Sequence, residues 1–454
     1  MSKPCLLATL GLVVVCGQAD SRTLDAGGLA VDRTGIDAPA TRAIQALIDE
    51  AADRGGGVVV FPAGDYRTGA LRLRSRVCLR LEHGAVIVGS DRLADYGDSP
   101  SLIYAKGEVD CRIDGSGVLN GQGTAFWKGK KRPYKRPERF ILFEDCENVR
   151  IEGIRIEDSP HWTVETRFCD GVWIDRVSIV NPLNAPNTDG IDPVSCRNVF
   201  ISNCYISTGD DAICPKSLAP QPCENVVVTN CVLESDDSAI KLGTRSETAI
   251  RHVTVSNCVI RNSAYGIAMF AKDGGAFEHL RFSNITIETT RKRRPEDDDS
   301  RDTYPIFLDL EQRGERGNRG AIRDVHFDGI TIDTDDGMCA VLGQPDRPIE
   351  NLRLTDISFT LHHRRSHNGN RKPRGVRNLK DLAENDCTSA PASFVFAHVD
   401  RLEIDRLRIN DLAPNPQHGR HGVWMKNVAN AHISSLRRLL VSPQPHLDDV
   451  FTAD

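Results

Sequence analysis

Four asparagines recur in this chain at a constant spacing. Asn203, Asn230, Asn257 and Asn284 lie 27 residues apart, and two acidic segments follow the same repeat, Asn-Thr-Asp-Gly-Ile-Asp at 187–192 and Gly-Asp-Asp-Ala at 209–212. A constant period of this length is typical of a solenoid, in which each coil buries its apolar face against its neighbours. Stacking turns positions far apart in the sequence into columns. The aspartates of neighbouring coils are therefore expected to converge on one site.

Short β-rich runs recur around these asparagines, and their alternation of apolar residues is typical of strands with one face inward. Asparagine at a fixed turn position tolerates the left-handed conformation and can hydrogen-bond its counterpart on the next coil. The 27-residue spacing returns between Gly329 and Asp356, so the array is expected to continue after an insertion. The runs are residues 149–156, 172–180, 199–206, 226–233, 253–260, 280–287, 325–332, 352–359, 402–409 and 432–439.

A helix is expected before the first coils. Residues 38–54 have helical spacing and lead into a glycine-rich apolar run at 55–62. Such a helix would cover the open end of a solenoid, which otherwise exposes a sheet edge. The sequence therefore predicts an all-β fold, a right-handed parallel β-helix with an N-terminal capping helix, as one domain over residues 20–454. Two charged or polar insertions, at 291–299 and about 362–385, are expected to be solvated loops.

The N-terminus has the pattern of a secretory signal at residues 1–19, with Lys3, an apolar stretch over 5–16 and small residues at 17–19. Elsewhere no apolar run approaches the roughly 20 residues of a membrane span. The net charge of −6 gives no electrostatic reason to expect nucleic acid. We therefore expect a secreted or periplasmic monomer without a membrane or nucleic-acid partner.

The fourteen cysteines suggest a disulfide framework at first. However, Cys204, Cys231 and Cys258 each follow a repeated asparagine, so they are expected to stack as small buried hydrophobic residues. No Cys-x-x-Cys pair is present, and a bridge between Cys214 and Cys223 is an alternative that spacing cannot decide. Mostly free, buried thiols are expected.

Four segments align in register around the acidic motifs. Parallel strands lie about 4.8 Å apart, so aligned side chains become neighbours. Clustered carboxylates repel and burial raises the pKa of at least one, which leaves a general acid beside an ionised partner that can activate water. Glycosidic bond hydrolysis needs this division of labour. Inert turns and a calcium site are the competing interpretations. The aligned column is Asp189, Asp211, Ser238 and Tyr265, flanked by Asp210 and Asp237.

At these residues the sequence resembles the polygalacturonase-like family of glycoside hydrolases, whose members have a pectin-lyase-like right-handed β-helix. Residues 187–192 match the Asn-Thr-Asp signature of the family and residues 209–211 its Gly-Asp-Asp signature. The resemblance implies inverting hydrolysis with Asp210 as general acid and with Asp189 and Asp211 positioning the water, without a metal or other cofactor. Supporting matches lie at 43–45, 55–62, 120–123 with Trp127, and 159–163.

Two departures from the family pattern concern the substrate. The histidine of a Gly-His-Gly triplet falls on Ser238, and an Arg-Ile-Lys motif that grips the uronate carboxylate aligns with residues 268–270, Ala-Met-Phe. A site for galacturonate should retain its paired cations. We therefore expect a pectic or related plant or algal polysaccharide or oligosaccharide other than simple polygalacturonan.

Seven residues are candidates for substrate binding. A structural ion pair competes for Lys216, packing between coils for Tyr265, and a surface position for Glu165. Two other activities also remain open: a polysaccharide lyase, which needs a base and a cation or calcium, and a non-catalytic carbohydrate-binding β-helix. The candidates are Asn187, Lys216, Ser238, Lys241, Tyr265, His161 and Glu165.

Overall fold

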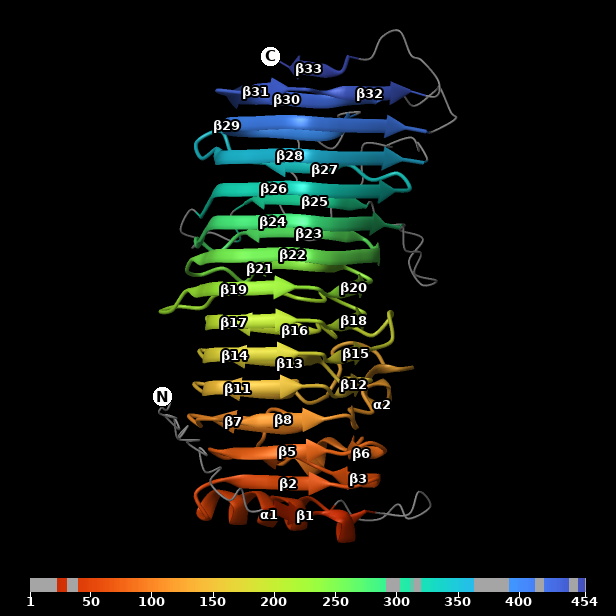
Figure 1. Cartoon of the computed structure of the whole chain (residues 1–454), viewed down its shortest axis with the longest axis vertical. Helices are drawn as coiled ribbons and strands as arrows, with labels where there is room; N and C mark the ends of the chain where they lie inside the picture. Colours follow the sequence, from red (N-terminus) through yellow and green to blue (C-terminus); the bar gives the residue numbers. More distant parts are fainter. Residues whose placement is uncertain are drawn as a thin grey trace, which may run out of the picture.

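The chain winds into a right-handed parallel β-helix, as the sequence predicts (Figure 1). The computed structural model describes residues 23–30, 40–290, 303–311, 313, 320–362, 392–412, 420–440 and 448–453. The expected signal at 1–19 and the insertions at 291–299 and 363–385 lie outside these residues. Within them, every pair of named strands is parallel, from β1 at one end to β33 at the other.

Each coil contributes to three faces of the solenoid. The first face holds β4 (Leu71–Arg72), β7 (Ile103–Lys106), β10 (Arg139–Glu144), β13 (Trp162–Arg167), β16 (Ile191–Val194), β21 (Ser238–Thr244), β23 (Tyr265–Ala271), β25 (Tyr304–Leu310), β27 (Cys339–Leu342), the start of β29 (Ala392–Asp411), β30 (His421–Ala429) and β33 (Val450–Ala453).

The second face holds β1 (Thr23–Asp25), β2 (Gly57–Phe61), β5 (Val77–Leu81), β8 (Arg112–Gly115), β11 (Glu147–Glu152), β14 (Asp170–Asp175), β17 (Arg197–Ser202), β19 (Cys223–Thr229) and β31 (His432–Ser434). The third holds β3 (Gly64–Thr68), β6 (Ala85–Gly89), β9 (Val118–Asn120), β12 (Arg155–Glu157), β15 (Ser178–Val180), β18 (Tyr205–Thr208), β20 (Val232–Ser235) and β32 (Arg437–Leu440). Four long strands bend across both faces: β22 (Ile250–Ser263), β24 (Ala276–Thr289), β26 (Ala321–Thr334) and β28 (Ile349–Leu361).

The repeated asparagines occupy the corner between the second and third faces. All four have a left-handed backbone, with φ between 52° and 57°. The Nδ2 of Asn230 donates to Oδ1 of Asn203 at 3.3 Å, and that of Asn284 donates to Asn257 at 2.8 Å. The predicted ladder is therefore confirmed, and it turns each coil at the same place.

Strand register keeps the coils aligned. Arg197 pairs with Glu224, Glu224 with Arg251 and Arg251 with Glu278, each step covering 27 residues. The next step, from Glu278 to Arg323, is longer and contains the insertion, after which the 27-residue step returns. Insertions therefore project from the coils without changing which residues pair.

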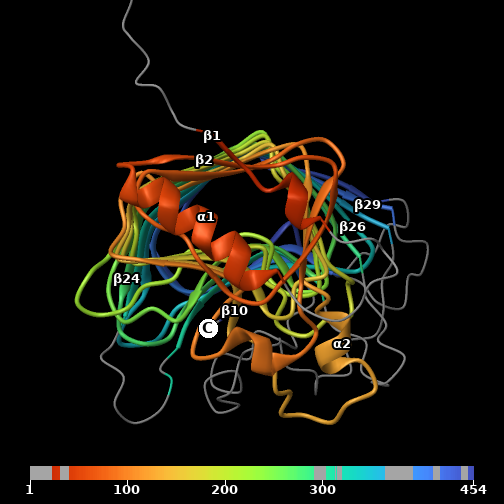
Figure 2. The ribbon, with the colours of Figure 1, turned by 90° about the horizontal axis from the view of Figure 1, so that it is seen from below.

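The interior is filled by columns of aliphatic and aromatic side chains from all three faces, nearly all fully buried. Helix α1 (Thr41–Asp53) buries Ile44, Ile48 and Ala51 and lies across the N-terminal end of the solenoid, as expected of a cap (Figure 2). The short helix α2 (Thr124–Trp127) lies outside the coils. No helix among the described residues is long and apolar enough to cross a membrane.

The cysteines of the described residues are all buried and free. Cys204, Cys231 and Cys258 stack on successive coils, and the alternative bridge between Cys214 and Cys223 is not formed. Burial therefore explains these residues as small core side chains.

Alternation along one strand provides a direct test of the core. In β22, Ile260 is fully buried whereas its neighbour Val259 is 43% exposed. Ile260→Ala should lower the free energy of unfolding by about 2–5 kcal/mol because it opens a cavity, and Val259→Ala should change it by less than about 0.5 kcal/mol. Urea denaturation followed by circular dichroism measures both. Equal losses would contradict the assigned inward and outward faces.

Candidate active site

The acidic motifs lie side by side on the first face. Ile191 bridges to Ile213, Ile213 to Ile240, and Ile240 pairs with Ile267, so the predicted register of the four segments is confirmed. The coil that carries Asp210 and Asp211 forms only isolated bridges between β16 and β21. The two aspartates therefore project from an irregular turn that is held between regular strands.

Among the residues that the structure describes, two of the three carboxyl groups have an ammonium partner and the third has none. Lys216 Nζ lies 3.3 Å from Asp189 Oδ2, and Lys241 Nζ lies 2.7 Å from Asp211 Oδ2. Among the described residues, no Lys or Arg pairs with Asp210, which is also the more exposed of the three. An adjacent cation favours the ionised form of a carboxyl. The pairing thus distinguishes Asp189 and Asp211, which each contact a lysine, from Asp210.

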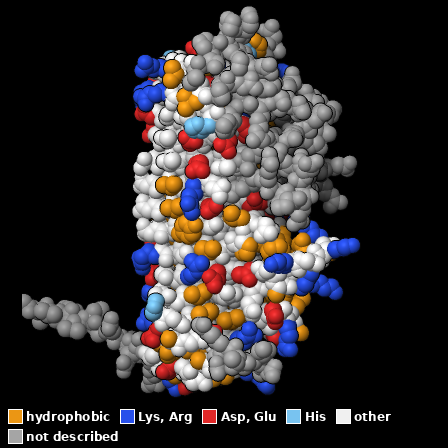
Figure 3. Space-filling model, turned by 90° about the vertical axis from the view of Figure 1, so that its right-hand side faces the viewer, with side chains coloured by type: hydrophobic (Ala, Val, Ile, Leu, Met, Phe, Trp, Pro, Cys, Tyr) orange, Lys and Arg blue, Asp and Glu red, His pale blue; other side chains and the backbone are white. Residues whose placement is uncertain are grey.

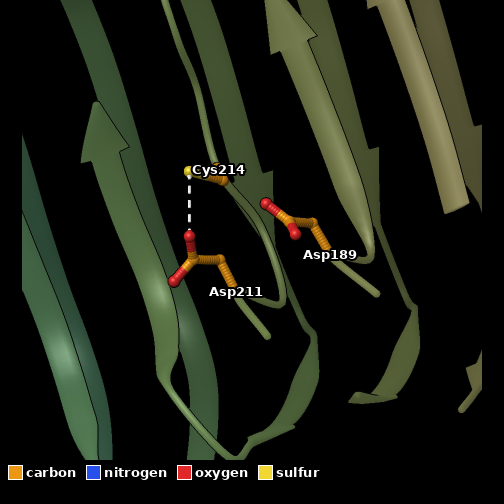
Figure 4. A group of neighbouring side chains, drawn as sticks. All are labelled: Asp189, Asp211 and Cys214. Atoms are coloured by element: carbon orange, nitrogen blue, oxygen red, sulfur yellow. Dashed lines mark hydrogen bonds between the residues drawn. The ribbon is translucent and has the colours of Figure 1, made fainter. Parts of the chain in front are cut away.

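Asp189 and Asp211 face the same space from neighbouring coils (Figure 4). Both are nearly fully buried, and each has one oxygen, Oδ1, without a hydrogen-bond partner among the described residues. The Sγ of Cys214 lies 3.6 Å from Asp211 Oδ2. The two free oxygens can accept hydrogen bonds from a water or a hydroxyl group placed between them.

Burial raises the pKa of Asp189 and of Asp210 well above the usual value for aspartate. Repulsion from the neighbouring carboxylates acts in the same direction, from Asp192 and Asp211 on Asp189, and from Asp189, Asp211 and Asp237 on Asp210. Such a cluster cannot be ionised at every position, so it holds a proton at neutral pH.

Asn187 connects Asp210 to the surrounding loops. Its backbone is left-handed, with φ of 53°, and its Nδ2 lies 3.5 Å from Asp210 Oδ2. Its Oδ1 accepts a hydrogen bond from Arg136 at 2.9 Å. Asn187 therefore approaches the carboxyl of Asp210, whereas the sequence suggested that it orients Asp189 or only forms the turn. Contact with a substrate stays a prediction.

Lys216 is an internal residue of the site. It is 5% exposed, forms ion pairs with Asp192 and Asp189, and its ammonium lies 4.3 Å from the centre of the Trp162 ring. These acidic neighbours outweigh the burial and raise its pKa well above the usual value for lysine. The structure thus contains the ion pair that competed with substrate contact. Lys241, with 15% of its side chain exposed, lies nearer to the surface.

A protonatable pair of His161 and Glu165 that shapes a subsite is a further interpretation of the sequence, but the two residues have different surroundings in the structure. Burial, reinforced by Arg136, Arg139 and Lys216, lowers the pKa of His161 to about 2, so its imidazole is neutral. Glu165 is 1% exposed and is held by Arg139 and Arg167. The expected surface position of Glu165 is therefore wrong. Its carboxylate orients arginines, and it is too enclosed for direct contact with a sugar.

Ser238 and Tyr265 are also enclosed. Ser238 is fully buried, and its Oγ lies 3.5 Å from Asp237 Oδ1. Tyr265 is 1% exposed and stacks on Tyr304 with ring centres 5.4 Å apart. Direct substrate contact does not fit this burial, and packing between coils is the observed role of Tyr265. The ring belongs to an apolar cluster that continues through Ala268, Phe270, Phe307 and Trp424 on the outer side of the first face.

Sequence reasoning missed Arg136 and Asp192. Arg136 donates to the carbonyls of Pro160 and Pro186 at 2.9 and 2.6 Å, besides Asn187. The sequence feature that could have indicated Arg136 is the basic run at residues 128–139, which carries seven Lys or Arg and one acid in a chain of net charge −6. Asp192 is the last residue of the Asn-Thr-Asp-Gly-Ile-Asp segment. Its ion pair with Lys216 could not be predicted from the sequence, because it depends on how the coils stack.

Two groups could supply cation ligands: Asp189 with Asp211 and Cys214, and Asp210 with Asp211 and Asp237. In each group the ligand atoms lie within 4.8 Å of one another. Lys216 and Lys241 already neutralise charge beside the aspartates of these groups. The arrangement therefore suits proton transfer without requiring a metal ion.

Comparison with known proteins identifies the family. The sequence profile described as Glycosyl hydrolases family 28 matches residues 59–372.

The chain belongs to glycosyl hydrolase family 28.

Relatives in this family share part of the chain. A probable polygalacturonase of Vitis vinifera is 30% identical over 228 residues, covering 45% of each protein. An endo-polygalacturonase of Pectobacterium carotovorum subsp. carotovorum is 28% identical over 209 residues, 39% of this chain and 51% of that protein. The matches thus span about half the length of these relatives.

Solved structures share the fold. An exopolygalacturonase from Thermotoga maritima superposes with a TM-score of 0.65 at 21% identity, covering 76% of this chain and 88% of that one. A polygalacturonase from Erwinia carotovora ssp. carotovora gives 0.58 at 21% identity, covering 74% and 92%. The expected resemblance of sequence and fold is confirmed.

The buried carboxylates predict a pH dependence of stability. Burial raises the pKa of Asp192 to about 6, compared with about 3.9 in an unfolded chain. A raised folded-state pKa contributes stability that is fully present below about pH 4 and is lost as the pH rises through about 6. The unfolding free energy of wild type minus that of Asp192→Asn should therefore be larger at pH 4 than at pH 7, by about 1–3 kcal/mol.

Urea denaturation at the two pH values measures this difference. Asp328→Asn, at an exposed position on β26, is the matched control and should change the unfolding free energy by less than about 0.5 kcal/mol at both pH values. A difference for Asp192→Asn that is independent of pH would contradict the raised pKa.

Proposed function

We propose that this protein is a secreted, monomeric glycoside hydrolase that cleaves a glycosidic bond in a pectic or related acidic polysaccharide or oligosaccharide, with inversion at the anomeric carbon. Family membership supports the reaction class. The observation that carries the proposal is the unequal pairing of the carboxyl groups: Asp189 and Asp211 each pair with a lysine, and no Lys or Arg of the described ranges forms an ion pair with Asp210.

Asp210 is the general acid. Its raised pKa keeps the proton available near neutral pH, and its partial exposure allows contact with a glycosidic oxygen. As the bond between the anomeric carbon and this oxygen breaks, the proton of Asp210 passes to the leaving oxygen. The free oxygens of Asp189 and Asp211 hold the attacking water and take its proton as the new bond to the anomeric carbon forms. Exchange with solvent then restores both groups.

The substrate is expected to differ from simple polygalacturonan. Ala268 and Phe270 are part of a buried apolar cluster, so these two positions offer a sugar carboxylate no cation. Any charge on the substrate must be met elsewhere in the site, because an unpaired buried charge is costly. This leaves a different sugar, or a different linkage, as the proposed substrate.

Replacing the acid tests the assignment. Asp210→Asn removes the proton donor at nearly constant volume, so sugar release should fall by roughly 10²- to 10⁴-fold while the unfolding midpoint is retained. Reducing-end release from a panel of pectic, hemicellulosic and algal glycans measures the loss.

Asp328→Asn is again the matched control and should keep wild-type activity, because the residue lies on β26, outside the first face. Wild-type turnover by Asp210→Asn would remove the general-acid assignment. Ultraviolet absorbance from an unsaturated product would instead identify a lyase, and a retained anomeric configuration in the first product, seen by proton NMR, would contradict inversion.

A further inference from the structure

A strongly basic segment borders the candidate active site. Residues 128–139 join α2 to the start of β10 and contain seven Lys or Arg and one acid. In Figure 2 this segment projects beside α2 from the lower side of the solenoid. Lys and Arg side chains gather on a projection at one edge of the molecule in Figure 3. The segment is thus strongly basic, whereas the whole chain has a net charge of −6.

The segment encloses a pocket of about 560 Å³. This volume is within the range of small-molecule sites. Three arginines and a single acid, Glu138, are among its lining residues. The side chains that carry the argument are Arg132, Tyr134, Arg136, Arg139, His161 and Asn187.

The arginines of the pocket differ in their partners, because Arg139 is paired with Glu165. The guanidinium of Arg136 donates only to neutral oxygens, those of Pro160, Pro186 and Asn187, and burial lowers its pKa to about 10. Among the described residues no carboxylate pairs with Arg132 or Arg136. His161 adds no charge because its imidazole is neutral. An anion in the pocket would therefore meet two guanidinium groups without a direct ion pair among the described residues, with Asp189 and Asp210 acting on Arg136 from beyond ion-pair distance.

The two arginines are held in place before any ligand arrives. Both guanidinium groups lie over the ring of Tyr134, at 5.8 Å for Arg132 and 5.6 Å for Arg136. The hydrogen bonds of Arg136 to three separate backbone and side-chain oxygens fix it further. Preorganisation of this kind lowers the entropic cost of binding.

The pocket adjoins the proposed general acid. Asn187 lines the pocket and also approaches Asp210 through its Nδ2. A sugar whose charged group occupies the pocket would thus lie beside the bond that Asp210 protonates. On the C-terminal side of the aspartates, by contrast, the first face carries the apolar cluster of Tyr265, Phe270 and Phe307.

We propose that this arginine pocket is a subsite for an acidic sugar, in which Arg132 and Arg136 bind the carboxylate of a uronic acid residue next to the scissile bond. The planar guanidinium matches a carboxylate in geometry and can bind it through two parallel hydrogen bonds. This inference rests on the proposed function, since it assumes that the cleft binds a carbohydrate. It assigns substrate specificity to the segment at 128–139.

Binding measured without turnover tests the subsite. Isothermal titration calorimetry on Asp210→Asn protein would use a uronic acid trisaccharide and the same trisaccharide with its carboxyls reduced to alcohols. Added Arg132→Gln should weaken binding of the acidic sugar by roughly 10-fold and change binding of the neutral sugar less than twofold. Arg136→Gln should act in the same direction. Arg132 is exposed, so its replacement should leave the fold intact.

The matched control is Arg197→Gln, which removes one exposed positive charge from the second face and should not change affinity. Unchanged binding of the acidic sugar by both pocket variants, an equal loss for acidic and neutral sugars, or no binding of the acidic sugar at all would overturn the subsite. Arginine-dependent binding of a sulfated trisaccharide but not of the uronic acid one would overturn the carboxylate assignment.

Failure of the subsite and failure of the proposed hydrolysis give different results. Arginine-dependent binding of a trisaccharide that the wild-type protein never cleaves would support the subsite and contradict the hydrolase. Cleavage that is unchanged by replacement of either arginine would support the hydrolase and contradict the subsite.

Discussion

Parallel strands on neighbouring coils must pair in a fixed register, because a slip of one residue would turn the apolar side chains outward. In this chain the register is kept by the buried columns and by asparagines that turn each coil at the same corner. The 27-residue step from Asp211 to Ser238 and on to Tyr265 follows from this constraint. The functional residues inherit their positions from the packing of the core.

The same stacking creates an electrostatic problem at the site. Asp189, Asp192 and Asp211 are buried on adjacent coils, and Lys216 and Lys241 bring opposite charge among them. Buried charges are tolerated when they are paired, and an excess carboxyl takes up a proton instead. Asp210 lies at the edge of this cluster and forms no ion pair with a Lys or Arg in the part of the chain that the structure describes. Asp210 therefore holds a proton because the two lysines pair with other aspartates of the cluster.

Repetition explains how much the sequence could predict. Asp211, Ser238 and Tyr265 could be aligned because they follow the 27-residue period of Asn203 and Asn230, and Asp189 was placed beside Asp211 by aligning its motif, 22 residues earlier, with the preceding coil. The capping helix was equally local, since its apolar spacing can be read within residues 38–54.

Contacts outside the period could not be predicted in the same way. Arg136 reaches the carbonyls of Pro160 and Pro186, which lie 24 and 50 residues away, from a loop with no repeat. The burial of Tyr265 and Glu165 depends on side chains from other coils, Tyr304 and Arg139 among them. A substrate-binding candidate chosen from the sequence alignment of the coils can therefore be buried by side chains of other coils.

The central claim is that stacking of the coils leaves Asp210 protonated beside two aspartates that each contact a lysine. Its most direct test is a pH titration of the aspartate carboxyl carbons by ¹³C NMR, with the Asp210 signal assigned by its loss in Asp210→Asn. Because burial and neighbouring carboxylates raise the pKa of Asp210, its signal should titrate well above the ordinary aspartate value of about 3.9. Titration of that signal near 3.9 would contradict the account.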